Sequence, residues 1–337
     1  MTSYPPVKIN LGLNVLRKRS DGFHDLETVF VQSGQFHDVL EIVTGDDYSR
    51  TMAGLVAKYG DRAGCGISGT DLQNVGAEDS REACIADDIP TLAQGISEDG
   101  KLMITVARAE GVDWDVCKDL CAKAYALLDN DFKLPPAKIF LEKLSPVGAG
   151  LGGGSADAAY TLTMLNEICN LGLSKEQLAG YAARLGSDCA FFVHGRPMFG
   201  EGRGEVLSPF DLPIEILDGG QTGAGRQNGE NHCPECGKGN KRKPAYELQI
   251  VVPEGISVST AEAYRGITPA IPEMRLKDVL SRPVSEWKDL LVNDFEATVF
   301  KAHPELAAIK QSLYDSGAAY ASMSGSGSAL FALYEKE

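Results

Sequence analysis

The chain has 337 residues, of which 43% are hydrophobic and 23% are charged. This is the composition of a globular protein long enough for two domains, and it excludes a disordered chain. Asp and Glu number 47 against 32 Lys and Arg, a formal net charge of -15, so the overall field repels nucleic-acid backbones and we expect no nucleic-acid partner. The sequence has no run of about 18 apolar residues and no N-terminal secretory pattern, which predicts a cytoplasmic protein with no membrane partner.

The chain begins as β structure. Apolar residues alternate with polar or small ones from Val7 to Leu16, and a second strand-like stretch runs from Leu26 to Val31. Residues 44 to about 100 lose this periodicity and are rich in Gly, Ala, Ser and Asp. We therefore predict that this stretch is rich in loops, with one short helix near Ala53–Tyr59. The predicted insertion as a whole spans about 44–114.

In the middle of the chain, the sequence predicts a helix, then a strand, and then two more helices. Apolar residues recur at helical spacing from Asp115 to Asn130. A strand is expected at Ala137–Lys143, followed by a glycine-rich loop and an apolar helix from Ser155 to about Cys169. Ser174 and Gln177 then have the spacing of a capping box, which predicts the start of another helix.

The C-terminal part mixes strands and helices. Residues 219–244 are low in hydrophobicity, which predicts a mobile surface insertion between two strands. Leu248–Val252 is expected to form a strand and Pro304–Ser316 a helix, and two strands at Ala319–Met323 and Ala329–Tyr334 flank a Gly-Ser-Gly turn. Together the elements indicate an α+β fold without an internal repeat.

Five glycines lie between residues 148 and 154, after a predicted strand and before an apolar helix. A helix N-terminus presents free N–H groups, and glycine lets phosphate oxygens approach the backbone closely. The segment therefore predicts a phosphate-binding loop, with a plain flexible loop as the alternative. No Gly-Lys-Ser/Thr follows, so it is not a Walker loop, and the absence of repeated βαβ units disfavours a dinucleotide fold.

Three glycine-containing motifs resemble those of the GHMP kinases, a superfamily of small-molecule kinases. PVGAGLGGGSADAA at 146–159 is similar to the second motif, PPVKINLGLNV at 5–15 to the first, and MSGSGSALFAL at 323–333 to the third. The resemblance implies a two-domain α+β fold with an active-site cleft between the domains. The N-terminal domain, ribosomal-protein-S5-like, would span 1–195, and a C-terminal α/β-plait domain would span 196–337.

Four further segments narrow the resemblance within the superfamily. RKRSDGFHDLETVF (17–30), LGSDCAFF (185–192), FGEGRGEVL (199–207) and VSTAEAY (258–264) are similar to segments of GHMP kinases in the non-mevalonate isoprenoid pathway. The implied reaction is the ATP-dependent phosphorylation of the 2-hydroxyl of 4-diphosphocytidyl-2-C-methyl-D-erythritol, with ATP and Mg²⁺ as cofactors. A GHMP kinase for another small alcohol and a non-catalytic ligand-binding sensor of the same fold remain the alternatives.

The resemblance also assigns residues to the phosphoryl-transfer machinery. Such a reaction needs a phosphate cradle, a group that accepts the hydroxyl proton, and positive charge. Asp188 would be the catalytic base and Lys8 the cation, with Lys143 as a further contributor to the local field. Ser155 would reach a phosphate or Mg²⁺. The predicted ATP-binding residues are Pro146, Gly148, Ala149, Gly150, Leu151, Gly152, Gly153, Gly154, Ser155 and Ala156.

A cytidine group calls for aromatic faces and polar groups at the edge of the base. By resemblance, Phe23 and Tyr264 would enclose the cytosine and His24 would hydrogen-bond it. Asn10 would hold the substrate near the catalytic lysine, with Thr260 as a weaker candidate. The alternative is a structural role in which the histidine and the aromatic rings belong to the core.

The remaining predictions concern the C-terminal glycine loop and two residues that depart from the family pattern. Gly325 and Gly327 are expected to close over the cleft. Asp119 stands where the family usually has Asn, which puts a contact with the adenine in doubt, and Ala190 replaces a common Pro.

The eight cysteines are too dilute for a disulfide scaffold, so we expect reduced thiols. Cys233 and Cys236 resemble half of a zinc knuckle. Structural zinc needs four ligands, and Cys65 and Cys84 would complete the set only if the two insertions met in space. A reduced surface loop is therefore the default expectation. The sequence gives no indication of the oligomeric state.

Overall fold

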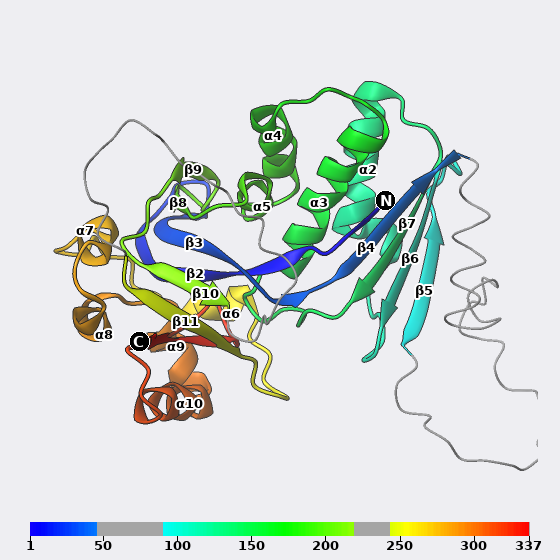
Figure 1. Cartoon of the computed structure of the whole chain (residues 1–337). Helices are drawn as coiled ribbons and strands as arrows, with labels where there is room; N and C mark the ends of the chain where they lie inside the picture. Colours follow the sequence, from blue (N-terminus) through cyan, green and yellow to red (C-terminus); the bar gives the residue numbers. More distant parts are fainter. Residues whose placement is uncertain (46–89, 219–242, 337) are drawn as a thin grey trace, which may run out of the picture. The chain divides into compact units, whose positions relative to one another are not determined.

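The computed structural model describes residues 1–45, 90–218 and 243–336. These residues form two compact units, each assembled from separate stretches of the chain (Figure 1). The stretches of unit 1 are Met1–Pro5, His37–Ser145 and Gly154–Val193, and those of unit 2 are Pro6–Phe36, Pro146–Gly153 and His194–Glu337.

The predicted boundary after residue 195 lies close to Val193, where unit 1 ends. The first long strands of the chain, within Pro6–Phe36, nevertheless belong to unit 2. The division into domains at 1–195 and 196–337 remains a prediction. The predicted helix at 53–59 and the predicted zinc candidates lie outside the described residues.

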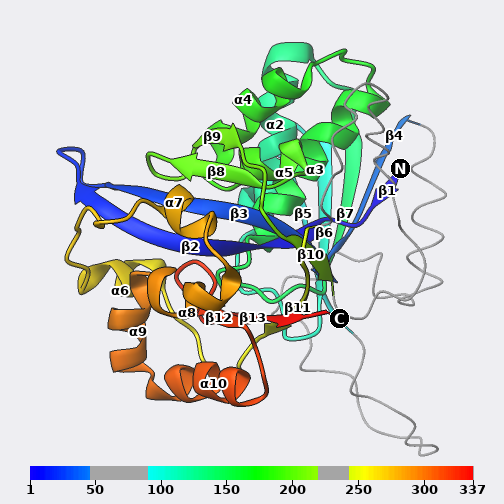
Figure 2. The same ribbon diagram turned by 60° about the vertical axis from the view of Figure 1, so that its left-hand side comes forward.

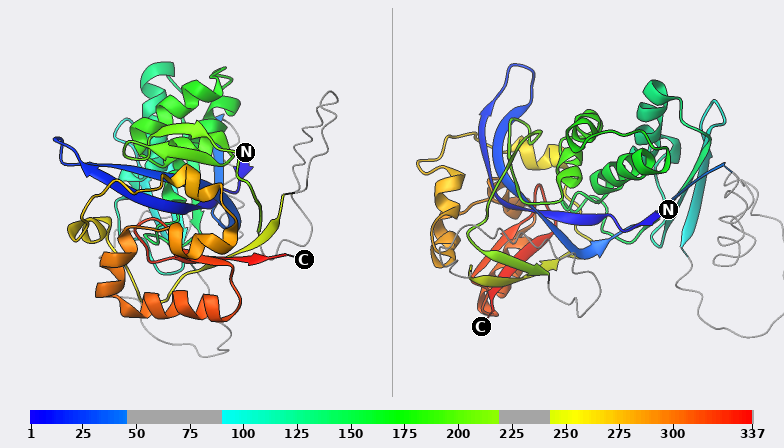
Figure 3. Two further views of the ribbon diagram at one scale, coloured as in Figure 1. Left: turned by 90° about the vertical axis from the view of Figure 1, so that its left-hand side faces the viewer. Right: turned by 45° about the horizontal axis from the view of Figure 1, so that its top comes forward.

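Unit 1 contains a five-stranded sheet in the order β1-β4-β7-β6-β5, in which only the β6–β7 pair is parallel. The strands are β1 (Thr2–Ser3), β4 (Val39–Thr44), β5 (Thr91–Ile96), β6 (Leu102–Arg108) and β7 (Ala137–Lys143). Its helices are η3 (Val116–Lys118), α2 (Leu120–Phe132), α3 (Gly153–Ile168), α4 (Lys175–Leu185) and α5 (Cys189–His194). Helices α2 and α3 lie side by side on one face of the sheet (Figure 1 and Figure 3).

The prediction that residues 44 to about 100 are rich in loops is wrong for Thr91–Ile96, because β5 is a regular strand of the sheet, and β6 follows it within the predicted insertion. Leu102, Ile104 and Val106 are buried on one face of β6, and Thr105 and Ala107 are buried on the other, so this strand is enclosed over most of its length. The glycine-, serine- and aspartate-rich sequence before the two strands obscured them.

Unit 2 contains two four-stranded sheets. One has the order β2-β3-β8-β9 and the other the order β10-β11-β13-β12. The strands are β2 (Pro6–Lys18), β3 (His24–His37), β8 (Met198–Glu201), β9 (Val206–Pro209), β10 (Glu215–Asp218), β11 (Ala245–Val251), β12 (Tyr320–Met323) and β13 (Leu330–Glu335). Its helices are α6 (Thr260–Arg265), α7 (Leu276–Leu280), η4 (Val284–Glu286), α8 (Trp287–Leu290), α9 (Phe295–Ala302) and α10 (Pro304–Asp315).

An apolar core cluster joins the two sheets of unit 2. Ile9 and Leu11 of β2 belong to the same buried cluster as Leu248 of β11 and Phe331 of β13. Because side chains alternate along a strand, these apolar residues leave Lys8 and Asn10 on the opposite side of β2. The helices of the described chain include none that is both long enough and apolar enough to cross a bilayer.

The glycine-rich loop of unit 2 packs against the C-terminal Gly-Ser-Gly turn through its backbone. The Ala329 amide donates to the Ala149 carbonyl at 3.1 Å, and the Ser324 hydroxyl donates to the Gly150 carbonyl at 3.1 Å. Gly150 has a φ of +77°, and a Cβ atom there would lie 2.2 Å from the Ser324 carbonyl oxygen. Only glycine therefore permits this contact.

The end of β7 carries a buried charge cluster in unit 1. The Lys143 ammonium bonds to both Asp38 and Asp157, at 2.7 Å from the Asp157 carboxylate. The second Asp38 oxygen accepts the Leu144 and Ser145 amides, each at 2.7 Å. Burial lowers the pKa of Lys143, but the two carboxylates outweigh this effect and raise it above its ordinary value. Lys143, which we expected to add to the field around the phosphates, is thus neutralised by two aspartates.

Substitution of Gly150 tests how closely the two loops approach. Gly150→Ala is expected to lose more stability than Gly148→Ala. Both positions have left-handed backbone, which costs an alanine roughly 1–2 kcal/mol, but no described atom lies within 4 Å of a Cβ at Gly148. Urea unfolding of both variants measures the difference in unfolding free energy. Equal losses would show that the loops do not touch at Gly150.

Removal of the buried cation tests the cluster in unit 1. Lys143→Met is expected to lower the free energy of unfolding by about 3–5 kcal/mol, because it leaves two buried carboxylates without a counter-charge. The matched control is Lys101→Met, which breaks the more exposed pair with Asp129 and should cost about 1 kcal/mol or less. Chemical denaturation gives both values. A loss at Lys143 no larger than the control's would contradict the proposed cluster.

Candidate active site

Lys8 is the centre of a polar cluster in unit 2. Its side chain is only 3% exposed, and its ammonium donates to the Asn10 side-chain oxygen and, at 2.8 Å, to the Gly150 carbonyl. Asn10 in turn donates to the Thr28 hydroxyl at 3.0 Å. The ammonium also lies 5.7 Å from the centre of the Phe30 ring, within range of a cation–π interaction. The predicted pair of Lys8 and Asn10 is therefore adjacent in the structure.

The Gly-Ser-Gly turn approaches the same cluster. A Cβ atom at Gly325 would lie 3.2 Å from the Asn10 side-chain oxygen and 3.3 Å from the Lys8 ammonium. Gly327 lies against the Met323 side chain instead. The structure thus brings three predicted elements of unit 2 together: the start of β2, the glycine-rich loop and the C-terminal turn.

The two remaining substrate candidates on α6 differ in their surroundings. The Thr260 hydroxyl lies 3.3 Å from the Ser326 hydroxyl in the C-terminal turn. The Tyr264 ring stacks on the His24 ring, with centroids 4.8 Å apart and planes inclined by 19°, and it also meets the Phe295 ring edge to face. A base cannot lie between His24 and Tyr264 at this separation, because a sandwiched ring needs about twice the stacking distance.

Phe23 lies at the turn of the β2–β3 hairpin, which projects away from β11 and β13 (Figure 2). Its side chain is 53% exposed, which is unusual for a large apolar ring and suits a stacking surface. The Phe23 amide donates to the Asp21 side chain at 3.1 Å and its carbonyl accepts the Arg19 amide at 2.8 Å. The turn is therefore held by its own hydrogen bonds.

The predicted catalytic base belongs to unit 1. Asp188 directly precedes α5 and is partly buried. The adjacent Cys189 thiol is hydrogen-bonded to the Ser155 side chain in the first turn of α3, and burial raises its pKa to about 11. Two predicted site residues, Ser155 and Asp188, are thus neighbours of the same neutral thiol.

Asp119 has a structural role as the N-cap of α2. Its carboxylate accepts the Cys121 amide at 2.9 Å and the Trp114 indole N–H at 3.1 Å. A capping carboxylate stabilises a helix through the orphan amides and the helix dipole. Ala190 is buried in α5.

The structure adds Asn293 to the site, which the sequence did not single out. Asn293 is buried, and its side-chain amide donates to the carbonyls of Met323 and Gly325 at 2.7 and 2.9 Å. It thereby fixes the conformation of the C-terminal turn. No local pattern marks such a residue, because its partners lie about thirty positions away in the chain.

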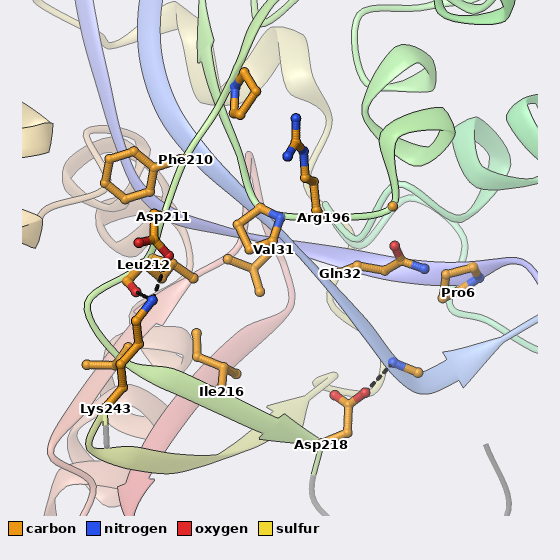
Figure 4. Close-up of a pocket in the computed structure, with 15 residues that line it drawn as sticks. Pro6, Val31, Gln32, Arg196, Phe210, Asp211, Leu212, Ile216, Asp218 and Lys243 are labelled. Carbon is orange, nitrogen blue, oxygen red and sulfur yellow. Dashed lines mark hydrogen bonds and ion pairs between the residues drawn. The ribbon is translucent and has the colours of Figure 1, made fainter. Parts of the chain in front are cut away.

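A pocket of about 840 Å³ opens elsewhere on unit 2 (Figure 4). Val31, Leu212 and Ile214 line its apolar part, and Arg196 and Lys243 lie at its charged margin. Lys243 is bound to the Asp211 carboxylate at 2.6 Å. None of the predicted site residues lines this pocket, so its volume does not mark the predicted chemistry.

No group of three or more His, Cys, Asp or Glu side chains among the described residues is arranged to hold a metal ion. The four described cysteines are free thiols.

Two family models match the chain. The GHMP kinases N terminal domain matches residues 119–196 and the GHMP kinases C terminal domain matches residues 276–337. A protein of Bacteroides fragilis named 4-diphosphocytidyl-2-C-methyl-D-erythritol kinase is 38% identical over 337 residues, which cover 100% of this chain and 93% of the relative. A protein of the same name from Cytophaga hutchinsonii is 32% identical over 99% of this chain and 92% of its own length.

Solved structures agree with these relatives. The crystal structure of a 4-(cytidine 5'-diphospho)-2C-methyl-D-erythritol kinase matches with a TM-score of 0.63 and 25% identity, over 99% of this chain and 90% of that one. The mevalonate kinase of Methanococcus jannaschii, at 11% identity and a TM-score of 0.52 over 99% of this chain and 90% of its own, shares the fold. The chain therefore belongs to the GHMP kinases and, among them, to the family of 4-diphosphocytidyl-2-C-methyl-D-erythritol kinases.

Proposed function

We propose that this chain transfers the γ-phosphoryl group of ATP to the 2-hydroxyl of 4-diphosphocytidyl-2-C-methyl-D-erythritol. The observation that carries the proposal is the buried Lys8 ammonium, which lies on the Gly150 carbonyl of the glycine-rich loop and beside Asn10. Burying an ammonium is costly unless it is well hydrogen-bonded. The presence of one beside the glycine-rich loop therefore supports a role in stabilising negative charge on a phosphate.

The reaction breaks the bond between the γ-phosphorus and the bridging oxygen of ADP and forms a bond to the substrate oxygen. The 2-hydroxyl proton must leave as this bond forms, and Asp188 is the proposed acceptor. Lys8 is proposed to stabilise the negative charge of the transferring phosphoryl group. The product ADP keeps the bridging oxygen and its negative charge.

The glycine-rich loop is proposed to bind the ATP phosphates. It leads into α3, whose first-turn amides have no partner within the helix and carry the positive end of the helix dipole. Mg²⁺, when bound, neutralises phosphate charge, and Ser155 is its proposed protein ligand. The remaining oxygen ligands would come from the phosphates and water.

The cytidine group is proposed to stack on the exposed Phe23 ring. Tyr264 can contribute its face only on the side that His24 does not cover, or after His24 moves. His24 is the proposed hydrogen-bonding partner of the base edge. Asn10, next to Lys8, is proposed to hold the erythritol portion.

The proposed function predicts ADP release only with the matching alcohol. Purified chain with ATP, Mg²⁺ and the cytidylyl substrate should release ADP, whereas mevalonate and homoserine should not support turnover. Turnover of mevalonate or homoserine alone would favour a kinase for another alcohol. Binding of the cytidylyl compound without turnover of any alcohol would favour the sensor.

The assignment of Asp188 as the catalytic base predicts a large loss of kcat when its carboxylate is replaced. Asp188→Asn is expected to lower kcat by about 10²–10⁴-fold, the usual contribution of a general base, while the thermal unfolding temperature stays close to that of the parent chain. Asp113→Asn, an exposed acidic position of unit 1, is the matched control and should keep full activity. An Asp188→Asn variant with unchanged kcat would exclude this residue as the base.

A further inference from the structure

A cation covers the exposed ring that we assign to the cytidine. The guanidinium carbon of Arg203 lies 4.8 Å from the centre of the Phe23 ring. This distance is within the range in which an arginine is attracted to an aromatic face. The segment around Arg203 is part of the motif FGEGRGEVL, to which the proposed mechanism assigns no role.

Hydrogen bonds anchor the backbone of both segments that make this contact. Arg203 lies in the turn between β8 and β9, where its amide donates to the Glu205 carboxylate at 2.5 Å. The neighbouring Gly202 carbonyl accepts the Leu26 amide of β3 at 2.7 Å. The β8–β9 turn is therefore tied to the hairpin that carries Phe23, and the contact joins two anchored segments.

The two arginines at the end of the β2–β3 hairpin are engaged with carboxylates. Arg17 bonds to Asp25, and Arg19 lies 3.0 Å from Asp21 and 3.3 Å from Asp25. Arg203 has a weaker ion pair, 3.4 Å from Glu205. Its planar guanidinium can therefore stack on the ring while it is held at one edge.

We propose that Arg203 is a positioning residue for Phe23 and sets the affinity for the cytidine group, an inference that rests on the proposed function. An exposed phenylalanine samples several rotamers, and fixing one of them for stacking costs conformational entropy. A guanidinium on one face of the ring favours one orientation in the free protein. The opposite face is then presented to the base, so less freedom is lost on binding.

The position of Arg203 predicts that its substitution changes the KM for the cytidylyl substrate but not the KM for ATP. Arg203→Ala should raise the KM for that substrate about two- to fivefold, the size of an exposed cation–π contact, with kcat and the KM for ATP unchanged. Arg203→Lys keeps a cation over the ring and should restore most of the loss. Lys18→Ala is the matched control, because it removes an exposed charge of the same hairpin and should leave the KM unchanged.

A double-mutant cycle with cytidine 5'-diphosphate as the probe separates positioning from direct contact. Calorimetry should show weaker binding for Phe23→Ala and for Arg203→Ala, and no further loss from Arg203→Ala once Phe23 is absent. Additive losses would mean that Arg203 binds the diphosphate directly, which overturns the positioning role.

The same titrations separate this inference from the proposed function. If the parent chain binds cytidine 5'-diphosphate and Phe23→Ala weakens binding, an unchanged Kd for Arg203→Ala overturns only the role of Arg203. If the parent chain fails to bind the nucleotide, the proposed cytidine specificity fails and the inference fails with it.

Discussion

The contact between the Lys8 ammonium and the Gly150 carbonyl is the constraint on which the candidate site depends. An ammonium that is 3% exposed must be hydrogen-bonded, and one of its acceptors is a backbone oxygen of the glycine-rich loop. That oxygen also accepts the Ser324 hydroxyl. The positive φ of Gly150 and the close approach of the C-terminal turn therefore follow from one requirement, which is to bring a backbone carbonyl to a buried cation without an intervening Cβ.

The two buried lysines show how the surroundings decide what a cation can do. Lys143 of unit 1 lies between two carboxylates, and its charge is used to join the end of β7 to Asp38 and to α3. Lys8 of unit 2 donates to an amide oxygen and to a backbone carbonyl. The Lys143 ammonium is thus committed to a buried ion-pair cluster of unit 1, whereas the Lys8 ammonium contacts the glycine-rich loop to which we assign phosphate binding.

Local patterns predicted the parts of this structure that depend on local physics. The long alternation of β2, the capping box of α4 and the strands around the Gly-Ser-Gly turn are confirmed, because alternation and capping involve residues a few positions apart. The strands β5 and β6 were missed, since short strands next to a glycine-rich stretch resemble a loop in sequence. The amide of Asn293 and the ring contact of Arg203 were also missed, because both are set by tertiary neighbours that no spacing in the sequence identifies.

A protein with a net negative charge repels a polyanionic ligand, and the strength of this repulsion depends on the distance between the charges. Charges in water are screened over about 8 Å at physiological ionic strength, whereas a buried charge is screened much less. Exposed carboxylates beyond this distance therefore have little effect on a bound phosphate despite the net charge of -15, whereas the backbone amides of the proposed phosphate-binding loop would act at short range. Oriented amides also carry no counter-charge that must be displaced. A site built from backbone dipoles and one enclosed ammonium can thus attract phosphate even in a strongly negative protein, so the net charge constrains encounter and solubility more than it constrains binding.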